Sequence, residues 1–136
     1  MSSILIVDDE PEGTEPILKF LQREGFQVTT APNGREALAF LSTAMPELVI
    51  LDLRMPQMDG ISFLATLRSY MRWKDLPVIL LTAYAEGPHL EIAKRYGATD
   101  VFKKGSIDLK RLLEVIRQKM PHHDGAPAGG VLAPEF

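Results

Sequence analysis

Cysteine is absent from the 136 residues of this chain. Its absence excludes a disulfide framework, thiolate catalysis and zinc–thiolate sites, and it is compatible with a reducing cytosol. A basic excess is also missing: the formal net charge is −3 at pH 7, so no global positive field draws the chain to nucleic acid or to an anionic membrane. Long apolar runs are missing too. The run at 4–7 is followed at once by acids, which excludes a signal peptide, and no run approaches a membrane span. We expect a soluble cytoplasmic protein.

The composition indicates one domain and a tail. Hydrophobic residues make up 46% and charged residues 24% of the chain, which suits a compact domain with a real core. We place this domain at residues 1–120. The remainder, 121–136, reads PHHDGAPAGGVLAPEF and has no periodicity, so we expect a flexible tail or the start of a linker. Its end reads equally well as a vector-encoded addition.

Short apolar runs alternate along the chain with segments of helical spacing. The runs are ILIV at 4–7, FQVTT at 26–30, LVIL at 48–51, VILLT at 78–82 and DVF at 100–102. The helical segments are 15–25, 34–44, 60–71, 88–97 and 106–120, the last with Ser106 as its expected N-cap. Continuous apolar strands are typical of a parallel sheet covered on both faces. The pattern therefore predicts a doubly wound α/β domain of five βα units.

Two further residues are assigned structural roles. Gly60, in MPQMDG, is expected to support a turn after the third strand. Trp73, which precedes KDLP, is expected to be a partly covered loop residue.

Polar residues stand at the carboxyl ends of four predicted strands. They are Asp8, Asp9 and Glu10 after the first strand, Asp52 after the third, Thr82 at the end of the fourth, and Lys103 and Lys104 after the fifth. In doubly wound sheets ligands bind at this edge. Converging carboxylates repel one another unless a cation lies among them, and Mg²⁺ is the ion that suits a few carboxylates plus a phosphate oxygen.

A hydroxyl and an ammonium beside such a metal provide donors for an anion. Together these groups predict a phosphoryl-transfer site in which a carboxylate is the nucleophile. The chain has neither a Walker loop nor a Gly-x-Gly-x-x-Gly motif, so a nucleotide is not the obvious donor.

Each of these residues also has an ordinary structural explanation. Acids after a strand stabilise a helix N-terminus, aspartate is a common turn former, and lysines after a strand are usually solvated. The prediction of a phosphoryl-transfer site therefore depends on acids, a hydroxyl and lysines occurring together at four separate strand ends.

Four sequence blocks carry a resemblance to a known family. ILIVDDE, LVILDLRMPQMDG, VILLTAY and GATDVFKK resemble the signature blocks of the receiver domain of bacterial two-component response regulators, over about residues 3–120. The resemblance implies a flavodoxin-like sheet of strand order 2-1-3-4-5 with five helices. It also implies a phosphoacceptor signalling domain rather than an enzyme, which takes a phosphoryl group from a sensor histidine kinase or phosphotransfer protein. The output partner or effector domain is not implied.

The resemblance assigns roles to individual positions. It implies that Asp52 is the phosphoacceptor, and that Asp8, Asp9, Asp52 and the backbone carbonyl of Arg54 hold Mg²⁺. Thr82 matches the switch hydroxyl, and Ala83 matches the small residue that leaves room for the phosphoryl group. Arg54 and Tyr84 match positions that tune the lifetime of the acyl phosphate, and because both are bulky we predict that they shield it from water.

The resemblance also chooses between the two lysines. When the family's motif is aligned with GATDVFKKGSI, its lysine matches Lys104, and Lys103 falls at a variable position where we expect it to be solvated. Two positions depart from the family. Val101 stands where an aromatic switch residue is usual, and Gly105 replaces a proline. Since a cis bond before a residue other than proline costs about 2.5–4 kcal/mol, we expect a trans Lys104–Gly105 peptide.

Three other functions compete with that of a receiver domain. A pseudo-receiver would keep the fold as a constitutive interaction domain, and the complete set of acids, threonine and lysine argues against it. A flavodoxin would need a phosphate-binding loop after the first strand, where this chain has acids. An aspartyl phosphatase would need a second carboxylate at the position of Arg54.

Overall fold

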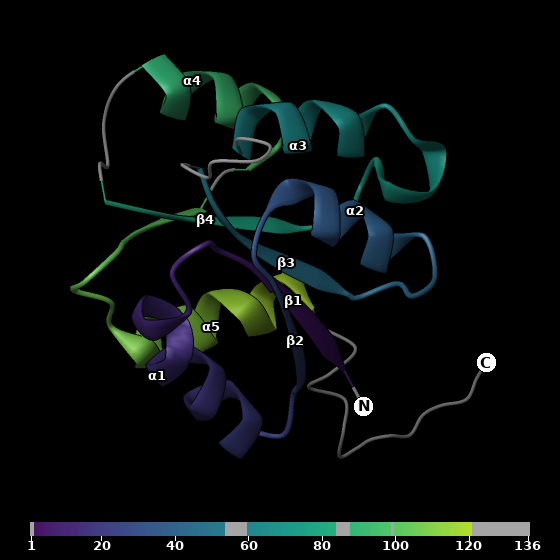
Figure 1. Ribbon diagram of the computed structural model, residues 1–136. Coiled ribbons are helices and arrows are strands. Elements are labelled where there is room, and N and C mark those ends of the chain that lie inside the picture. The colour runs from purple at the N-terminus through teal and green to yellow at the C-terminus, as the bar shows by residue number, and fades with distance from the viewer. Residues whose placement is uncertain (1, 54–59, 84–87, 99, 121–136) are drawn as a thin grey trace.

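The computed structural model describes residues 2–53, 60–83, 88–98 and 100–120, which form a five-stranded parallel sheet with helices on both faces (Figure 1). The strands are β1 (Ser3–Val7), β2 (Gln27–Ala31), β3 (Leu48–Asp52), β4 (Val78–Thr82) and β5 (Asp100–Lys103). The helices are α1 (Pro11–Arg23), α2 (Gly34–Leu41), α3 (Gly60–Arg68), α4 (Pro88–Arg95) and α5 (Leu109–Lys119), with a short 3₁₀ helix, η1 (Met71–Trp73). The strand order is β2-β1-β3-β4-β5, so the predicted fold is confirmed.

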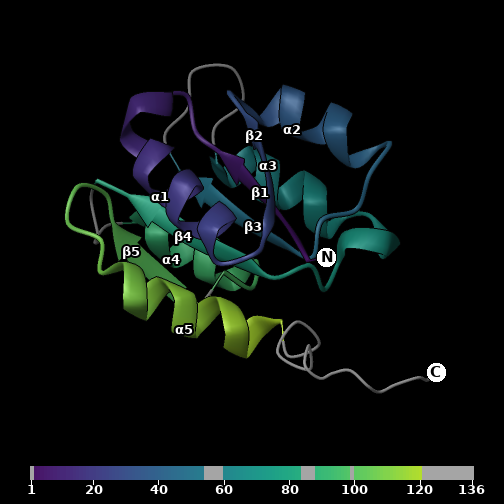
Figure 2. The same cartoon turned by 90° about the horizontal axis from the view of Figure 1, so that it is seen from below.

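Alternation along the strands divides the core into two layers. One layer takes Leu5, Val7, Val49, Leu51 and Leu80 from the strands and packs them against α2, α3 and α4. The other takes Ile4, Ile6, Ile50, Ile79 and Leu81 and packs them against α1 and α5. Figures 1 and 2 show these two groups of helices on opposite faces of the sheet. Every residue of β3 and β4 is buried, as expected for central strands that are covered on both sides.

The helices begin and end somewhat differently from the predicted segments. The first begins at Pro11 instead of residue 15, because proline is well suited to a first helical position, where its missing N–H has no helical partner. No helix in the described ranges is long and apolar enough to cross a membrane.

The predicted N-cap of α5 is wrong. The cap is Asp108, whose Oδ1 accepts hydrogen bonds from the backbone N–H groups of Lys110 at 3.1 Å and Arg111 at 3.2 Å. Ser106 lies two residues earlier, in a turn in which its own N–H donates to the carbonyl of Lys103. A carboxylate at the N-cap also interacts favourably with the helix dipole, so aspartate is the better cap.

Asp108→Ala is expected to destabilise the domain by about 1 kcal/mol, because two N–H groups lose their acceptor. Ser106→Ala is the matched control and should leave the free energy of unfolding nearly unchanged. Urea unfolding measures both. Equal losses in the two variants would contradict the assignment of Asp108 as the cap.

The expectation for Trp73 is also wrong. This residue lies in η1 rather than in a loop, is only 5% exposed and belongs to the core layer of α3. Its ring packs against Tyr70, with the ring centroids 4.8 Å apart. The segment KDLP follows directly and returns the chain to β4.

Candidate functional site

The sheet brings the predicted polar residues to one edge. Asp52 is the last residue of β3 and Thr82 the last of β4, while Asp8 and Lys104 follow β1 and β5 directly. The parallel register pairs Val7 with Leu51 and Asp52 with Leu81, so these strand ends are level with one another. Asp8, Asp52 and Thr82 are all buried, with at most 5% of their surface exposed. Such burial is unusual for two carboxylates and requires a compensating cation.

Lys104 supplies a positive charge at this edge. Its Nζ lies 3.0 Å from Asp8 Oδ1, 2.9 Å from Glu10 Oε1 and 3.4 Å from Asp52 Oδ2. Only 13% of its side chain is exposed. The backbone holds it in place, because the N–H of Lys104 donates to the carbonyl of Thr82 at 2.7 Å. The ammonium group after β5 therefore joins carboxylates at the ends of β1 and β3.

The charges of this cluster support one another. Burial alone lowers the pKa of Lys104, but hydrogen bonds to Glu10 and Asp8 and the charge of Asp52 outweigh it, so this pKa lies above its usual value. The hydrogen bond from Lys104 lowers the pKa of the exposed Glu10 carboxyl. Glu10 thus remains ionised until the pH falls through its lowered pKa, and Lys104 remains protonated until the pH rises past its raised pKa. Both groups are charged throughout the neutral range.

Acidic oxygens suited to a divalent cation gather beside the lysine. Carboxylate oxygens of Asp8, Asp9 and Glu10 lie within 4.8 Å of one another. Asp8 Oδ1 accepts from the N–H of Glu10 at 2.9 Å, which fixes this carboxylate. Asp8 Oδ2 lies 3.0 Å from Lys104 Nζ, but it is buried and accepts no hydrogen bond of good angle within the described part of the chain. An oriented, incompletely satisfied carboxylate oxygen fits a hard cation such as Mg²⁺.

Two glycines provide space around the cluster. A Cβ on Gly13, in α1, would lie 3.3 Å from Lys104 Cε, so a side chain there would crowd the lysine. A Cβ on Gly60, the first residue of α3, would lie 2.5 Å from Leu53 Cα and 3.0 Å from the carbonyl oxygen of Asp52. The prediction that Gly60 supports the turn after β3 agrees with this close backbone approach.

The two lysines of the sequence have different surroundings. Lys103 is exposed, whereas Lys104 points into the acidic cluster. The Lys104–Gly105 peptide is trans, as predicted, and Gly105 has a φ of 94°, which its lack of a side chain permits. Glu10 was noticed as an acid at the strand end but received no role. Glu10 and Lys104 are 94 positions apart in the sequence, so no local sequence pattern could predict their contact.

Some of the remaining candidate residues lie in the described part of the chain and others do not. Val101 is half-buried and packs with the layer under α3 and α4, while Phe102 packs with the opposite layer. Phe102 therefore lies on the other face of β5 from Val101. Ala83 is exposed directly after Thr82. Arg54 and Tyr84 lie outside the described residues.

Comparison with known proteins begins at the family level. Residues 4–117 match the family model for the response regulator receiver domain.

Individual relatives include chains of very different length. Sporulation initiation phosphotransferase F from Bacillus subtilis is 32% identical over 118 residues, which cover 87% of this chain and 93% of that protein. Response regulator Rre1 from Synechocystis is 48% identical over 82 residues, which cover 60% of this chain and 36% of that protein. The chain thus spans nearly all of one relative and about a third of the other.

Among solved structures, response regulator protein TrrA from Thermotoga maritima, in complex with Mg²⁺ and BeF, is similar to this fold with a TM-score of 0.76. It is 35% identical, and the match covers 88% of this chain and 99% of that one.

Proposed function

This chain belongs to the response regulator receiver domain family, and from that premise we propose that Asp52 is its phosphoacceptor. Receiver domains are signalling domains of two-component systems that interact with histidine kinases or phosphotransfer proteins. One observation carries the assignment to Asp52: its buried carboxylate lies 3.4 Å from Lys104, which also contacts Asp8 and Glu10. Asp8 already accepts a hydrogen bond from the N–H of Glu10, and Asp9 is exposed. Asp52 is the buried carboxylate at the end of β3, the middle strand of the sheet.

The chemical step is an in-line transfer. A carboxylate oxygen of Asp52 forms the O–P bond while the P–N bond of the donor phosphohistidine breaks, and the bonding electron pair leaves with the imidazole nitrogen. Lys104, already 3.4 Å from Asp52, neutralises charge on the transferring oxygens. The domain turns over no separate substrate, and slow hydrolysis of the acyl phosphate returns it to the resting form.

A magnesium site would be built from Asp8, Asp9 and Asp52, with the backbone carbonyl of Arg54 as a further ligand. Its two supports are the acidic cluster after β1 and the incompletely satisfied Oδ2 of Asp8. Bound Mg²⁺ would screen the phosphoryl charge from the surrounding carboxylates. Glu10 is engaged with Lys104 at 2.9 Å and is not required as a ligand.

Phosphorylation of Asp52 would change the conformation of the domain through Thr82. The backbone link between Thr82 and Lys104 joins β4 to the end of β5, so a rearrangement at either residue reaches the other. Val101 lacks the hydroxyl and ring of an aromatic switch residue, and we infer that the coupling here depends on Thr82 and the backbone. The partners would be a sensor histidine kinase or phosphotransfer protein in the cytoplasm and an output partner of unassigned type.

Acetyl phosphate and Mg²⁺ provide the direct test. Intact-mass spectrometry is expected to show an adduct of about 80 Da, the mass of a phosphoryl group in place of a proton, on the wild-type chain and none on Asp52→Asn. The amide is nearly isosteric with the carboxylate, so loss of the adduct reports chemistry rather than folding. A wild-type chain that stays unmodified would instead indicate a pseudo-receiver. An adduct that survives in Asp52→Asn would place the acceptor elsewhere.

The bulky tuning residues give a second prediction. The half-life of the phosphorylated form is expected to shorten in Arg54→Asn and in Tyr84→Ala, because both changes admit water to the acyl phosphate. The decay of the adduct after removal of acetyl phosphate measures this half-life. Equal half-lives in wild type and both variants would contradict a shielding role.

A further inference from the structure

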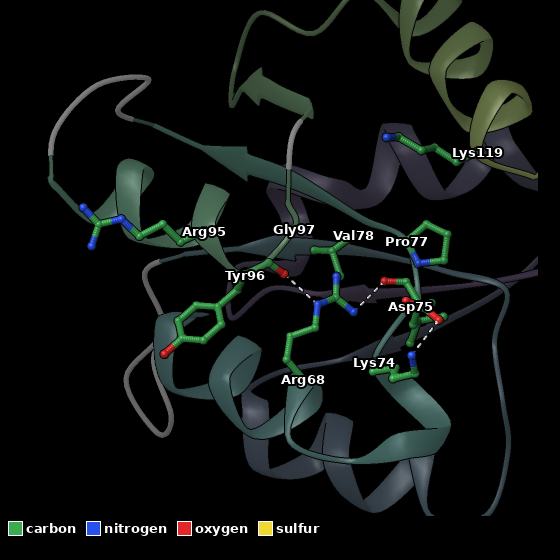
Figure 3. A pocket seen from close by; sticks show the side chains of 10 residues that line it. Arg68, Lys74, Asp75, Pro77, Val78, Arg95, Tyr96, Gly97 and Lys119 are labelled. Carbon is green, nitrogen blue, oxygen red and sulfur yellow. Dashed lines mark hydrogen bonds and ion pairs between the residues drawn. The ribbon is translucent and has the colours of Figure 1, made fainter.

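A pocket lies at the opposite end of the sheet from Asp52. It has a volume of about 540 Å³, within the usual range for small-molecule sites. Its wall is formed by Val78, the first residue of β4, by the preceding residues 74–77, and by residues from the ends of α3, α4 and α5 (Figure 3). Asp52 and Thr82 are at the other ends of their strands. The pocket is therefore separate from the phosphorylation site.

Cations dominate the lining of this pocket. Arg68, Lys74, Arg95 and Lys119 line it, and Asp75 is the single carboxylate among the described residues of the lining. Asp75 has 88% of its side chain exposed and pairs with Lys74 at 3.6 Å. The whole chain has a net charge of −3, so this pocket has the opposite sign from the molecule that carries it.

Arg68 is the centre of the pocket. Its Nε donates to the carbonyl of Tyr96 at 2.6 Å (Figure 3). Its Nη1 donates to the carbonyls of Trp73 at 3.0 Å and Leu76 at 2.8 Å. Its Nη2 makes no hydrogen bond to any residue that the structure describes, and it would lie only 3.4 Å from a Cβ on Gly97. Glycine at that position thus leaves the unused donor uncovered.

The guanidinium of Arg68 is partly desolvated, and no carboxylate of the described residues lies at hydrogen-bond distance from it. Burial lowers its pKa, and the charge of Asp75 opposes this only in part. Basic residues in the last turn of a helix also complement the helix dipole, and this explains why Arg68, Arg95 and Lys119 are favourable at their positions. It does not explain why three helix ends converge on one open cavity or why Arg68 Nη2 faces it. A bound anion would complete this arrangement.

We propose that this pocket binds a small organic anion, with its phosphate or carboxylate group held by Arg68 and Lys74, while Arg95, whose guanidinium points away from Arg68, adds positive charge at the edge of the pocket (Figure 3). The apolar part of the ligand would lie against Pro77, Val78 and Tyr96, which supply the uncharged part of the lining. Lys119 also lines the pocket, but its ammonium is engaged with Asp100 at 2.7 Å.

Phenyl phosphate is the probe. Titration in Mg²⁺-free buffer, followed by ¹H–¹⁵N spectra of the full chain, is expected to give saturable shifts confined to the amides of residues 68, 74–76, 78 and 95–97. Without Mg²⁺ the acidic edge around Asp52 repels the probe, so binding there does not interfere. No saturation by roughly 10 mM, or shifts spread over the whole surface, would overturn the proposal.

Matched variants identify the cations that matter. Arg95→Gln and Lys74→Gln together are expected to weaken binding at least about fivefold, as expected for loss of charge-assisted contacts. Lys94→Gln removes the same charge from the neighbouring exposed position of α4, outside the pocket, and should leave the affinity unchanged. Both lining residues are exposed, so neither change threatens folding. Equal weakening by Lys94→Gln would overturn the proposed site, and equal affinity for inorganic phosphate would overturn the role of the apolar wall.

Discussion

Lys104→Met is expected to slow the phosphorylation of Asp52 by acetyl phosphate about 100-fold or more, the usual loss when a preorganised charge donor is removed from a transfer site. Its ammonium lies 3.4 Å from Asp52 Oδ2 and is mostly buried, so it acts in surroundings where water screens charge poorly. Methionine keeps most of the length and apolar surface of the side chain while it removes the charge. The measurement is the rate of adduct formation at a fixed concentration of acetyl phosphate and Mg²⁺.

Lys103→Met is the matched control, because it removes the same charge one position earlier, where the side chain is exposed. The control should keep a rate close to that of the wild type. Comparable slowing in both variants would mean that the effect is general electrostatics, and would contradict the assignment of Lys104 as the active-site lysine.

The same variant separates a chemical role from a structural one. Without Lys104, the buried carboxylates of Asp8 and Asp52 lose their shared cation, so the variant should melt at a lower temperature in Mg²⁺-free buffer. If Asp8 and Asp52 are metal ligands, added Mg²⁺ should raise the melting temperature of the variant more than that of the wild type. A variant that recovers its stability with Mg²⁺ and still reacts slowly has lost chemistry rather than its fold.

The fold was predictable because its signals are local. Runs such as VILLT are short, β-branched and continuous, and β4 is buried along its whole length. Once five such runs alternate with helices, the polar residues that follow them must meet at one edge of the sheet. Asp52, Thr82 and Lys104 were placed together by this reasoning, and they lie together in the structure.

What the sequence did not reveal depends on competition or on distance along the chain. Ser106 and Asp108 are both good N-cap residues, and only the path of the chain after β5 decides between them. Glu10 contacts Lys104, which lies 94 positions later in the chain. Arg68 joins the segment before β4 to the end of α4 through backbone carbonyls that carry no sequence signature. Trp73 is buried because it packs into the core layer of α3, although it lies in a segment whose composition is typical of a loop.

Gly60→Ala is the substitution expected to disturb the loop after the acceptor most. An added Cβ would approach Leu53 Cα to 2.5 Å and the carbonyl oxygen of Asp52 to 3.0 Å, and backbone atoms cannot rotate aside as a side chain can. The hydrogen bond from the N–H of Gly60 to the carbonyl of Leu53, 2.9 Å long, would have to lengthen or break. We expect a loss of about 2–3 kcal/mol of unfolding free energy, at the upper end of the overpacking range. Urea unfolding measures it.

Gly25→Ala gives the comparison, because Gly25 has a φ of 98° and nothing within 4 Å of its added Cβ. Its loss should be about 1 kcal/mol and come from backbone conformation alone. A Gly60→Ala variant no less stable than Gly25→Ala would show that the β3–α3 connection yields at little cost. If Gly60→Ala is instead both unstable and slow to accept a phosphoryl group at temperatures where it is fully folded, then close packing of α3 against the end of β3 is what fixes the backbone of Asp52 for the reaction.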